Sequence, residues 1–293
     1  MNIRDEKREM AILSRAGPFQ NVFREILKMS RRIQKRRKIN LRVGIAGFGK
    51  MGRLFARELD SAFTGFYSEY HPSDFSSIQE MYEHSDVIIL ASKREKIKRY
   101  LIEISRIARK SSERKIVFDI STIKSPIVSF YANFPDYLKV ASVHPMFGPG
   151  IESLENSLFI VTPVEGRIED AEEISSFIQS LGGRVEVMDV RAHDRLIKYV
   201  IGLPYAIGVA YLDIMHKRDI HIGGTSYKIL STYGKAILND SEDFIREILN
   251  FSEEAIKEFQ NSLDRAKPSA VREFFKKEDI RVAYEKFYSF LQS

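Results

Sequence analysis

The stretch LRVGIAGFGKMG, residues 41–52, decides the fold class of this chain. Its first six residues are mostly apolar and predict a strand, and the glycines after them predict a turn into a helix that runs to about residue 61. Gly47 allows the tight turn, Gly49 lets the backbone approach a pyrophosphate, and Gly52 lets the helix pack closely on the strand. These residues therefore predict a dinucleotide-binding loop. The other predicted cofactor-binding members of the loop are Phe48, Lys50 and Met51.

Strand and helix patterns alternate after this loop, which predicts a mainly parallel sheet with helices on both faces. Further strands are predicted at Gly65–Ser68, Val87–Leu90, Ile116–Asp119, Val140–Val143, Leu158–Pro163 and Arg184–Val190, with helices at Lys93–Lys110 and Glu169–Leu181 among those between them. Later residues carry helical patterns alone, chiefly at Ala192–Met215, Ser226–Asn239 and Asp243–Lys267. We therefore expect an α/β Rossmann-type domain over residues 41–191, then an all-helical substrate and dimerisation domain over residues 192–293.

The composition is that of a soluble globular protein and excludes several classes of function. Of the 293 residues 44% are hydrophobic, and none of the apolar runs approaches the roughly 18 residues that a membrane span needs. The chain has no cysteine, which excludes disulfides and thiolate chemistry, and we predict no metal site. A charged start between Arg4 and Glu9 does not read as a signal peptide. We expect a cytoplasmic protein without a membrane partner.

Positive charge is concentrated in a basic helical segment, residues 1–40. This segment holds twelve Lys/Arg and four Asp/Glu, a net charge of +8, so the rest of the chain carries −2. Its basic run, residues 31–38, suggests a nucleic-acid patch, but interleaved aromatic residues and a known nucleic-acid module are missing from it. We expect a solvated helix end and linker, and no nucleic-acid partner.

An acidic residue about 20 positions beyond the first glycine is expected to bond the ribose of the cofactor. Glu69 lies 22 residues after Gly47 and fits this role, and its carboxylate favours NAD over NADP, whose 2′-phosphate it would repel. A solvated strand-end charge is the alternative interpretation of Glu69, and Asp74 is a weaker candidate for the ribose. The remaining predicted cofactor contacts follow two later strands, at Ala91 and Ser121.

Two segments at predicted strand ends are expected to face the reacting end of the cofactor, because ligands of such sheets bind beyond the carboxyl ends of the strands. One is DISTIK, residues 119–124, and the other contains His144. A neutral imidazole can accept a proton from a substrate hydroxyl while the carbon gives up hydride. A nearby hydroxyl, such as that of Thr122, can fix the orientation of the ring. Thr122 as a helix N-cap and Lys124 as a solvated charge are the structural alternatives.

These segments together resemble prephenate dehydrogenase over about residues 41–265. The resemblance rests on HPMFGP at residues 144–149, DISTIK at 119–124, GFGKMGRLF at 47–55 and AHD at 192–194. It implies a Rossmann domain followed by a helical dimerisation domain, and the oxidative decarboxylation of prephenate by NAD to 4-hydroxyphenylpyruvate in tyrosine biosynthesis. It also implies that His144 is catalytic, that Thr122 replaces an orienting serine, and that His193 and Gly148 contact the substrate.

The chain departs from the family where the substrate carboxylate is expected to bind. Tyr205 stands where the family commonly has histidine, and no arginine occurs between Arg218 and Arg246. Lys228 is the nearest cation, although an alignment on Gly234 puts a tyrosine at that position. Lysine supplies charge without the bidentate fork of arginine. Arogenate dehydrogenase, or a related hydride-transfer enzyme, therefore stays open as an alternative function.

The basic helical segment resembles the end of an all-helical chorismate mutase. Ser30 and Gln34 are four residues apart, on one helical face, as in the last helix of that enzyme. About the first half of a mutase is missing, so the resemblance implies a helix for dimer packing or one that completes a chorismate mutase in trans. An ordinary N-terminal helix is the alternative. A third hypothesis for the whole chain is a non-catalytic nucleotide-binding partner of such a mutase.

Overall fold

The computed structural model describes residues 6–24, 26–27, 39–59 and 61–289. They divide into two compact units after His193, which we call the sheet unit and the helical unit. The division lies two residues beyond the boundary expected at residue 191, so His193 belongs to the sheet unit. Ser30, Gln34 and the basic run at residues 31–38 lie outside the described residues.

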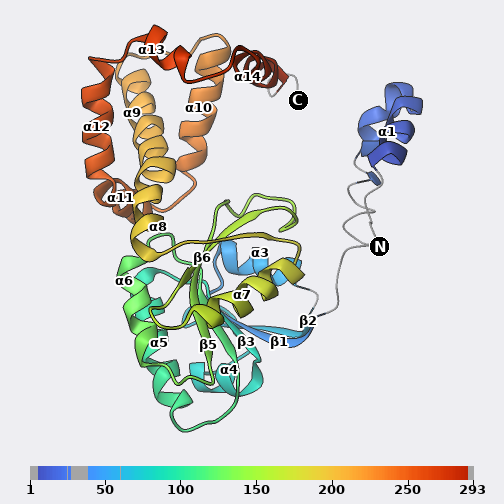
Figure 1. Cartoon of the computed structure of the whole chain (residues 1–293), viewed down its shortest axis with the longest axis vertical. Helices are drawn as coiled ribbons and strands as arrows, with labels where there is room; N and C mark the ends of the chain where they lie inside the picture. The colour runs from blue at the N-terminus through green and yellow to red at the C-terminus, as the bar shows by residue number, and fades with distance from the viewer. Residues whose placement is uncertain (1–5, 25, 28–38, 60, 290–293) are drawn as a thin grey trace. The chain divides into compact units, whose positions relative to one another are not determined.

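The described part of the sheet unit contains one seven-stranded sheet, in the order β2-β1-β3-β4-β5-β6-β7 (Figure 1). The strands are β1 Ile39–Ala46, β2 Ser61–Tyr67, β3 Val87–Leu90, β4 Ile116–Asp119, β5 Lys139–Pro145, β6 Leu158–Pro163 and β7 Arg184–Val187. Neighbouring strands are parallel except β5 and β6, whose antiparallel register places His144 opposite Ile160. The mainly parallel Rossmann-type sheet predicted from the sequence is confirmed.

Helices cover both faces of this sheet because both faces of its strands are apolar. One face packs against α3 (Lys50–Glu58) and α7 (Ile168–Ser180). The other packs against α4 (Ile78–His84), α5 (Arg94–Ala108), α6 (Ser125–Val128) and η2 (Ser129–Asn133). Chain order reverses on either side of β1, and sheets of this type bind ligands beyond the carboxyl ends of the strands at such a reversal, here β1 and β3.

The last strand is shorter than the sequence predicts. The apolar alternation continues to Val190, but β7 ends at Val187 and α8 (Val190–Ile197) begins immediately afterwards. Asp189 is the reason, since its Oδ1 accepts the backbone N–H groups of Arg191 and Ala192 at 2.9 and 3.0 Å. A side chain that caps the first turn of a helix in this way favours helix over strand.

Before the sheet, α1 (Glu6–Arg15) is followed by a short 3₁₀ turn, η1 (Gly17–Phe19). Gly17 has a φ of +51°, in the left-handed region, and Pro18 follows it, so the helix ends where the sequence predicts a break. The apolar side chains of Phe19, Val22 and Ile26 are 53–63% exposed.

The helical unit is built around α9 (Leu203–Lys217), which follows α8 through a π-helical turn, η3 (Lys198–Gly202). The other helices are α10 Thr225–Ile237, α11 Glu242–Phe251, α12 Glu253–Leu263, α13 Pro268–Glu273 and α14 Lys277–Ser289. α9 and α10 meet at Gly208 and Gly234, where a Cβ on Gly234 would collide with the carbonyl oxygen of Gly208. The helix predicted at Ala192–Met215 contains the π-helical turn η3 between α8 and α9. The helix predicted at Asp243–Lys267 is divided at Ser252 into α11 and α12.

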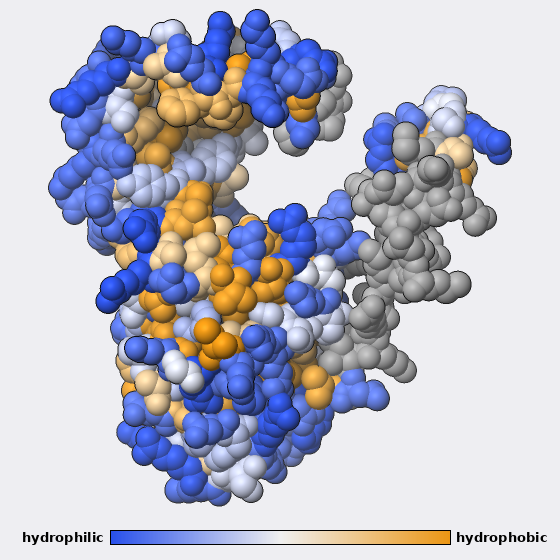
Figure 2. Space-filling model, viewed as in Figure 1, coloured by the Kyte–Doolittle hydropathy of each residue, from blue (hydrophilic) through white to orange (hydrophobic). Residues whose placement is uncertain are grey.

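The apolar surface of α9 is only partly covered. Of its residues, all within the described part of the chain, Gly208 alone is buried. The helical stretch Val190–Lys217 is, by length and composition alone, long and apolar enough to cross a membrane, and 17% of its most apolar window is buried. Hydrophobic side chains also lie at the surface of the helical unit in Figure 2, among hydrophilic ones.

Candidate active site

The glycine loop joins β1 to α3 at the point where the strand order reverses. Gly47 has a φ of +135°, and a Cβ there would collide with the carbonyl oxygen of Ala91 at the end of β3. The turn is fixed on both sides, since the N–H of Gly47 donates to Tyr67 at 3.0 Å and that of Ala91 donates to Ala46 at 2.9 Å. Glycine is thus required at position 47 by the backbone of the protein itself.

Gly49, by contrast, faces open space. It is the N-cap of α3, the helix has no side-chain cap there, and a Cβ at Gly49 would meet nothing within 4 Å. Uncapped N–H groups and the positive end of the helix dipole form a cradle that suits a pyrophosphate. Lys50 adds an exposed cation in the first turn, and Phe48 packs edge-on against Phe66 at 4.9 Å. Met51 packs against the core under the sheet, which gives it a structural role beside the loop.

Glu69 lies just beyond β2, in the position expected of the ribose-binding acid. It is engaged by two cations of α5, because Lys96 is 3.2 Å from its Oε2 and Arg99 pairs with its Oε1. Burial pushes the pKa of Glu69 up, but Lys96 and Arg99 outweigh it and leave the pKa below the ordinary value. Lys96 also sits over the ring of Tyr70 at 4.2 Å. Glu69 is therefore ionised and held at the sheet edge.

Asp74, the alternative acid, has another role in the fold. Its Oδ2 accepts the N–H of Phe66 at 2.8 Å, and its own N–H donates to the carbonyl of Phe66 at 2.9 Å. This double contact pins the loop after β2 to the strand. The carboxylate of Asp74 therefore holds the backbone of Phe66, whereas that of Glu69 contacts side chains. Glu69 is the better candidate for the ribose.

A buried polar cluster follows β4. Lys124 is fully buried, and its Nζ donates to the carbonyls of Ser121 and Val143, at 2.6 Å each, and lies 3.8 Å from Asp119. The carboxylate of Asp119 also accepts the N–H of Ser121 at 2.8 Å and the hydroxyl of Tyr131 at 3.0 Å. Burial and the neighbouring Asp119 raise the pKa of Tyr131 well above its ordinary value. The cluster contradicts the interpretation of Lys124 as a solvated charge.

His144, near the end of β5, lies against His193 in the first turn of α8. The Nδ1 of His144 is 3.0 Å from the Nε2 of His193, and the side chains are 4% and 0% exposed. Burial lowers the pKa of His144 well below its ordinary value, and the charge of Lys124 and the proximity of His193 lower it further. His144 is therefore neutral at physiological pH and has a lone pair to offer.

Thr122 does not orient His144 in this structure. We expected its hydroxyl to contact the ring, but within the described residues Thr122 makes no side-chain hydrogen bond, and His193 takes the Nδ1 position. The loop after β4 turns inward through Ser121, whose hydroxyl donates to Asp119 and Ile123, so Ser121 shapes this loop. No local sequence signal identifies His193 as the partner, because the two histidines are 49 residues apart.

The expected substrate contacts are differently placed. Gly148 lies in an exposed turn after β5, where a Cβ would meet nothing within 4 Å. In the helical unit, the hydroxyl of Tyr205 donates to Asp240 at 2.6 Å, and burial with this carboxylate raises the pKa of Tyr205. Lys228, on α10, is exposed and forms no ion pair within the part of the chain that the structure describes. Tyr205 is thus already committed to a carboxylate of its own unit.

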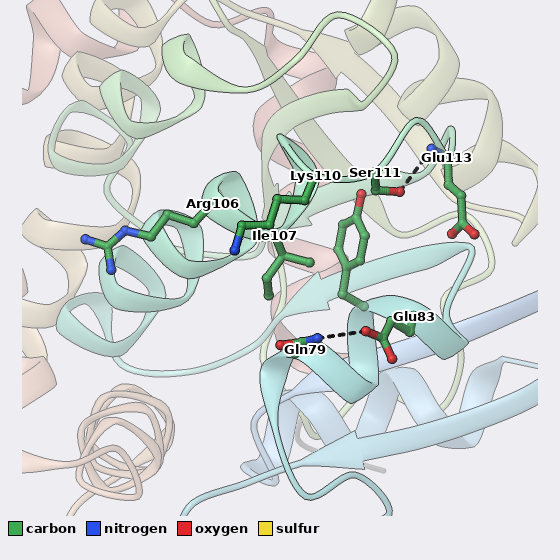
Figure 3. Close-up of a pocket in the computed structure, with 8 residues that line it drawn as sticks. Gln79, Glu83, Arg106, Ile107, Lys110, Ser111 and Glu113 are labelled. Atoms are coloured by element: carbon green, nitrogen blue, oxygen red, sulfur yellow. Dashed lines mark hydrogen bonds between the residues drawn. The ribbon is translucent and has the colours of Figure 1, made fainter.

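A separate cavity lies at the opposite edge of the sheet, where the parallel strands begin (Figure 3). It has a volume of about 390 Å³ between α4 and α5, and Gln79 donates to Glu83 at 2.9 Å along one wall. Arg106 and Lys110 line the side formed by α5. This cavity contains none of the predicted site residues.

Comparisons with known proteins find related chains. Residues 66–187 match the family described as prephenate dehydrogenase, nucleotide-binding domain. A curated relative, "Probable arogenate/prephenate dehydrogenase" of Methanocaldococcus jannaschii, is 29% identical over 129 residues, which are 43% of this chain but 28% of the relative's length.

Solved structures extend the likeness of fold beyond the matched residues. Prephenate dehydrogenase of Aquifex aeolicus, in complex with hydroxyphenyl propionate and NAD+, superposes with a TM-score of 0.62 at 20% identity, covering 86% of this chain and 97% of its own. Synechocystis arogenate dehydrogenase superposes with a TM-score of 0.54 at 15% identity, covering 87% of this chain and 96% of its own. Residues 66–187 are thus similar to the nucleotide-binding domain of prephenate dehydrogenases, and the likeness of fold extends over most of the chain.

Proposed function

We propose that this chain is an NAD-dependent dehydrogenase that oxidatively decarboxylates prephenate to 4-hydroxyphenylpyruvate. The observation that carries the proposal is the pairing of a neutral, buried His144 with His193 at the carboxyl edge of the sheet, the same edge as the glycine loop. Such an edge is where Rossmann-type sheets bind both nucleotide and substrate. A base in a buried pocket and a nucleotide cradle are the two parts that hydride removal from a hydroxylated carbon requires.

In the proposed reaction, the residues of the chain position the substrate and take up one proton. NAD, when bound, supplies the hydride acceptor. The Nε2 of His144 accepts the proton of the ring hydroxyl as the carbon that bears it is oxidised, and loss of carbon dioxide leaves an aromatic ring. Because aromatisation drives the step, placement of groups and a matched base are sufficient. Burial, helped by the charge of Lys124, lowers the pKa of His144 and so keeps the imidazole neutral before the substrate arrives.

NAD is the proposed cofactor because an ionised carboxylate lies at the end of β2. Glu69 offers its oxygens to the 2′ and 3′ hydroxyls of a ribose and repels a 2′-phosphate. Lys96 and Arg99 both engage this carboxylate. We expect Glu69→Ser to release the two cations and shift the ratio of NAD to NADP affinity toward NADP, measured by calorimetric titration. Arg94→Ser, at the start of α5, is the control, and an unchanged ratio in Glu69→Ser would remove Glu69 from cofactor selection.

Prephenate rather than arogenate is proposed on the family resemblance, with arogenate dehydrogenase as the alternative function. The two substrates differ at the side chain, which carries a keto group in prephenate and an amine in arogenate. Tyr205 is bonded to Asp240, and Lys228 offers charge without a bidentate fork. The observation that favours arogenate is the hydrogen bond from Tyr205 to Asp240. If Tyr205 contacts the substrate, the carboxylate of Asp240 would favour the amine of arogenate over the keto group of prephenate.

We further propose a homodimer formed through the helical unit. α9 contacts α10, α11 and α12, and its Ile214 is 53% exposed, while Tyr199, in η3 before it, is 39% exposed. The exposed residues alternate with polar ones such as Asp213 and Lys217, which form an ion pair at 2.6 Å. A second copy of this chain suits such a mixed surface better than lipid does, because every lipid-facing residue would have to be apolar.

Two proposals concern the setting of the chain. A cytoplasmic location follows from the proposed biosynthetic role. For residues 1–40, the exposed side chains of Phe19, Val22, Phe23 and Ile26 recur at helical spacing and support packing against another chain. A chorismate mutase completed in trans is the partner that the sequence resemblance suggests, and restored chorismate consumption on mixing with mutase fragments tests it.

One assay tests the activity. Purified chain is mixed with prephenate or arogenate and with NAD or NADP, and the reduced cofactor is followed by absorbance. We expect the highest kcat/KM with prephenate and NAD. Faster turnover of arogenate would establish the alternative substrate. Nucleotide binding without turnover of either substrate would refute the enzymatic proposal and favour a non-catalytic nucleotide-binding partner.

A further inference from the structure

We propose that His193 is a positioning residue that sets the tautomer of His144, and that the two rings together share one proton during the reaction. The inference rests on the proposed function and deepens it at the same site. The sequence predicts that His193 contacts the substrate. We propose instead that His193 contacts the base, His144.

The distance between the rings limits the protonation states of the pair. Each neutral imidazole has one N–H donor and one acceptor nitrogen. The 3.0 Å contact from Nδ1 of His144 to Nε2 of His193 is therefore made in one of two ways. If His144 donates, its Nε2 carries a lone pair and can act as a base. If His193 donates, the Nε2 of His144 carries the hydrogen and cannot accept a proton.

Regular backbone fixes both rings in place. His144 belongs to β5, where it is held opposite Ile160 of the antiparallel neighbour β6. His193 is held by the first turn of α8, since its N–H donates to the carbonyl of Asp189 at 2.9 Å while the Asp189 carboxylate caps the same turn. The planes of the two rings meet at 63°, with centroids 5.2 Å apart. A partner fixed this firmly can hold a ring in one orientation.

The charges around the pair favour a single shared proton. Lys124 donates to the carbonyl of Val143, the neighbour of His144, and Asp119, which Tyr131 bonds, offsets part of the lysine's charge. A second proton on the pair would add another cation beside Lys124 in a buried site, which is strongly unfavourable. Among the described residues, Lys124 and His193 are the groups whose charge acts on His144, and Asp119 lies 3.8 Å from Lys124.

The proton movement balances without a further reactant. The substrate hydroxyl gives its proton to Nε2 of His144, and the hydrogen on Nδ1 moves toward the lone pair of Nε2 of His193. The pair gains one proton and one positive charge in total, which it later returns to solvent. When Nδ1 of His144 is the donor, Nε2 of His193 carries a lone pair, so it can take up the hydrogen as the pair becomes cationic.

The test uses the full chain with two substitutions, His193→Phe and His193→Gln. Phenylalanine keeps the bulk and removes the acceptor, while the side-chain oxygen of glutamine still accepts. Nitrogen-15 NMR of the ligand-free protein should show His144 protonated at Nδ1 in the wild type and in His193→Gln. His193→Phe should lose this preference, and its kcat should fall about 10- to 100-fold, the usual loss when a partner that orients a histidine is removed. Its KM should stay near that of the wild type.

Controls separate this inference from the proposed function. His84→Phe changes an exposed histidine of the same unit and should leave tautomer and kcat unchanged. Thermal melting and NAD titration check that each variant is folded. If the wild type turns over no substrate, the proposed function fails, yet the NMR still decides the tautomer. Protonation of His144 at Nε2 in the wild type, or equal kcat in His193→Phe and the wild type, would overturn the inference.

Discussion

The sheet unit and the helical unit differ in how completely they bury their apolar side chains. In the sheet unit, two apolar clusters cover both faces of the sheet, and the polar groups of the site are buried within the same unit. In the helical unit, the most apolar helix, α9, buries Gly208 alone among its residues, all of which the structure describes. The difference supports the proposed dimer, in which a second copy would cover part of α9.

The same contrast applies to chemistry. His144, His193 and Lys124 are at most 4% exposed, and their environment shifts the pKa of His144. The groups expected in the helical unit, Tyr205 and Lys228, are half-buried and exposed respectively. In the proposed function the proton chemistry belongs to the sheet unit, and the proposed dimer is formed through the helical unit. Four predictions test this division, from the largest expected effect to the smallest.

His144→Ala should cause the largest loss. Removal of a general base costs about 10²- to 10⁴-fold in rate, so kcat should fall within that range while circular dichroism stays that of a folded protein. The matched control is His221→Ala, an exposed histidine of the helical unit. Steady-state kinetics measures both variants. If kcat of His144→Ala equals that of the wild type, His144 is not the general base.

Two alanine substitutions in the glycine loop should separate stability from binding. Gly47→Ala puts a Cβ against the carbonyl of Ala91 at a φ of +135°, so unfolding should become easier by about 1–3 kcal/mol or more. Gly49→Ala meets nothing within 4 Å and should unfold like the wild type, but its methyl group occupies the pyrophosphate cradle and should weaken NAD binding. Urea titration and calorimetry measure the two effects. Unaltered NAD affinity in Gly49→Ala would contradict the placement of the phosphates.

Ile214→Lys should dissociate the proposed dimer. Burial of an isoleucine side chain contributes about 1.5–3 kcal/mol, and a lysine at its place would bring an unpaired charge into the interface. Ile102→Lys is the control in the sheet unit, because Ile102 is exposed on α5 at 41% and Ile214 on α9 at 53%. Light scattering after gel filtration should give the mass of one chain for Ile214→Lys and of two chains for the control. Two chains in both variants would place the interface elsewhere.

The smallest expected effect concerns pH and stability. The pKa of His144 lies well below its ordinary value of 6.5, so below that pH the unfolded chain binds a proton that the folded chain does not. The free energy of unfolding should therefore decrease on acidification below about pH 6.5, by up to about 1.4 kcal/mol per pH unit from this group. His144→Asn should remove that part of the slope in urea titrations at pH 5 to 7. Parallel curves for the two proteins would show that His144 does not titrate there.

Much of the sheet was predictable because its strands are short apolar runs with polar residues at both ends. β3, β4 and β6 lie at their predicted bounds, Val87–Leu90, Ile116–Asp119 and Leu158–Pro163. The apolar alternation predicted β7 to extend to Val190, three residues beyond its end at Val187. Alternation carries no information on the side chain of Asp189, which caps the next helix. The glycine loop was also predictable, because its glycines are close together in the sequence and each has a local backbone requirement.

The polar environment of the base was not predictable in the same way. DISTIK contains a hydroxyl, that of Thr122, which local reasoning assigns to His144, but the chain brings in His193 from 49 residues away. The burial of Lys124 likewise depends on the carbonyl of Val143 and on Asp119, which the fold of the sheet brings within reach. Contacts of this kind follow from tertiary packing, and a single sequence carries little signal for them.

The short edge strand β7 has a consequence for how copies of the chain can meet. An open sheet edge invites strands of other molecules to add to it, and charged side chains discourage this. β7 has four residues, and two of them, Arg184 and Glu186, are charged and exposed. This edge therefore discourages growth of the sheet from one molecule into the next, and with it the formation of fibres.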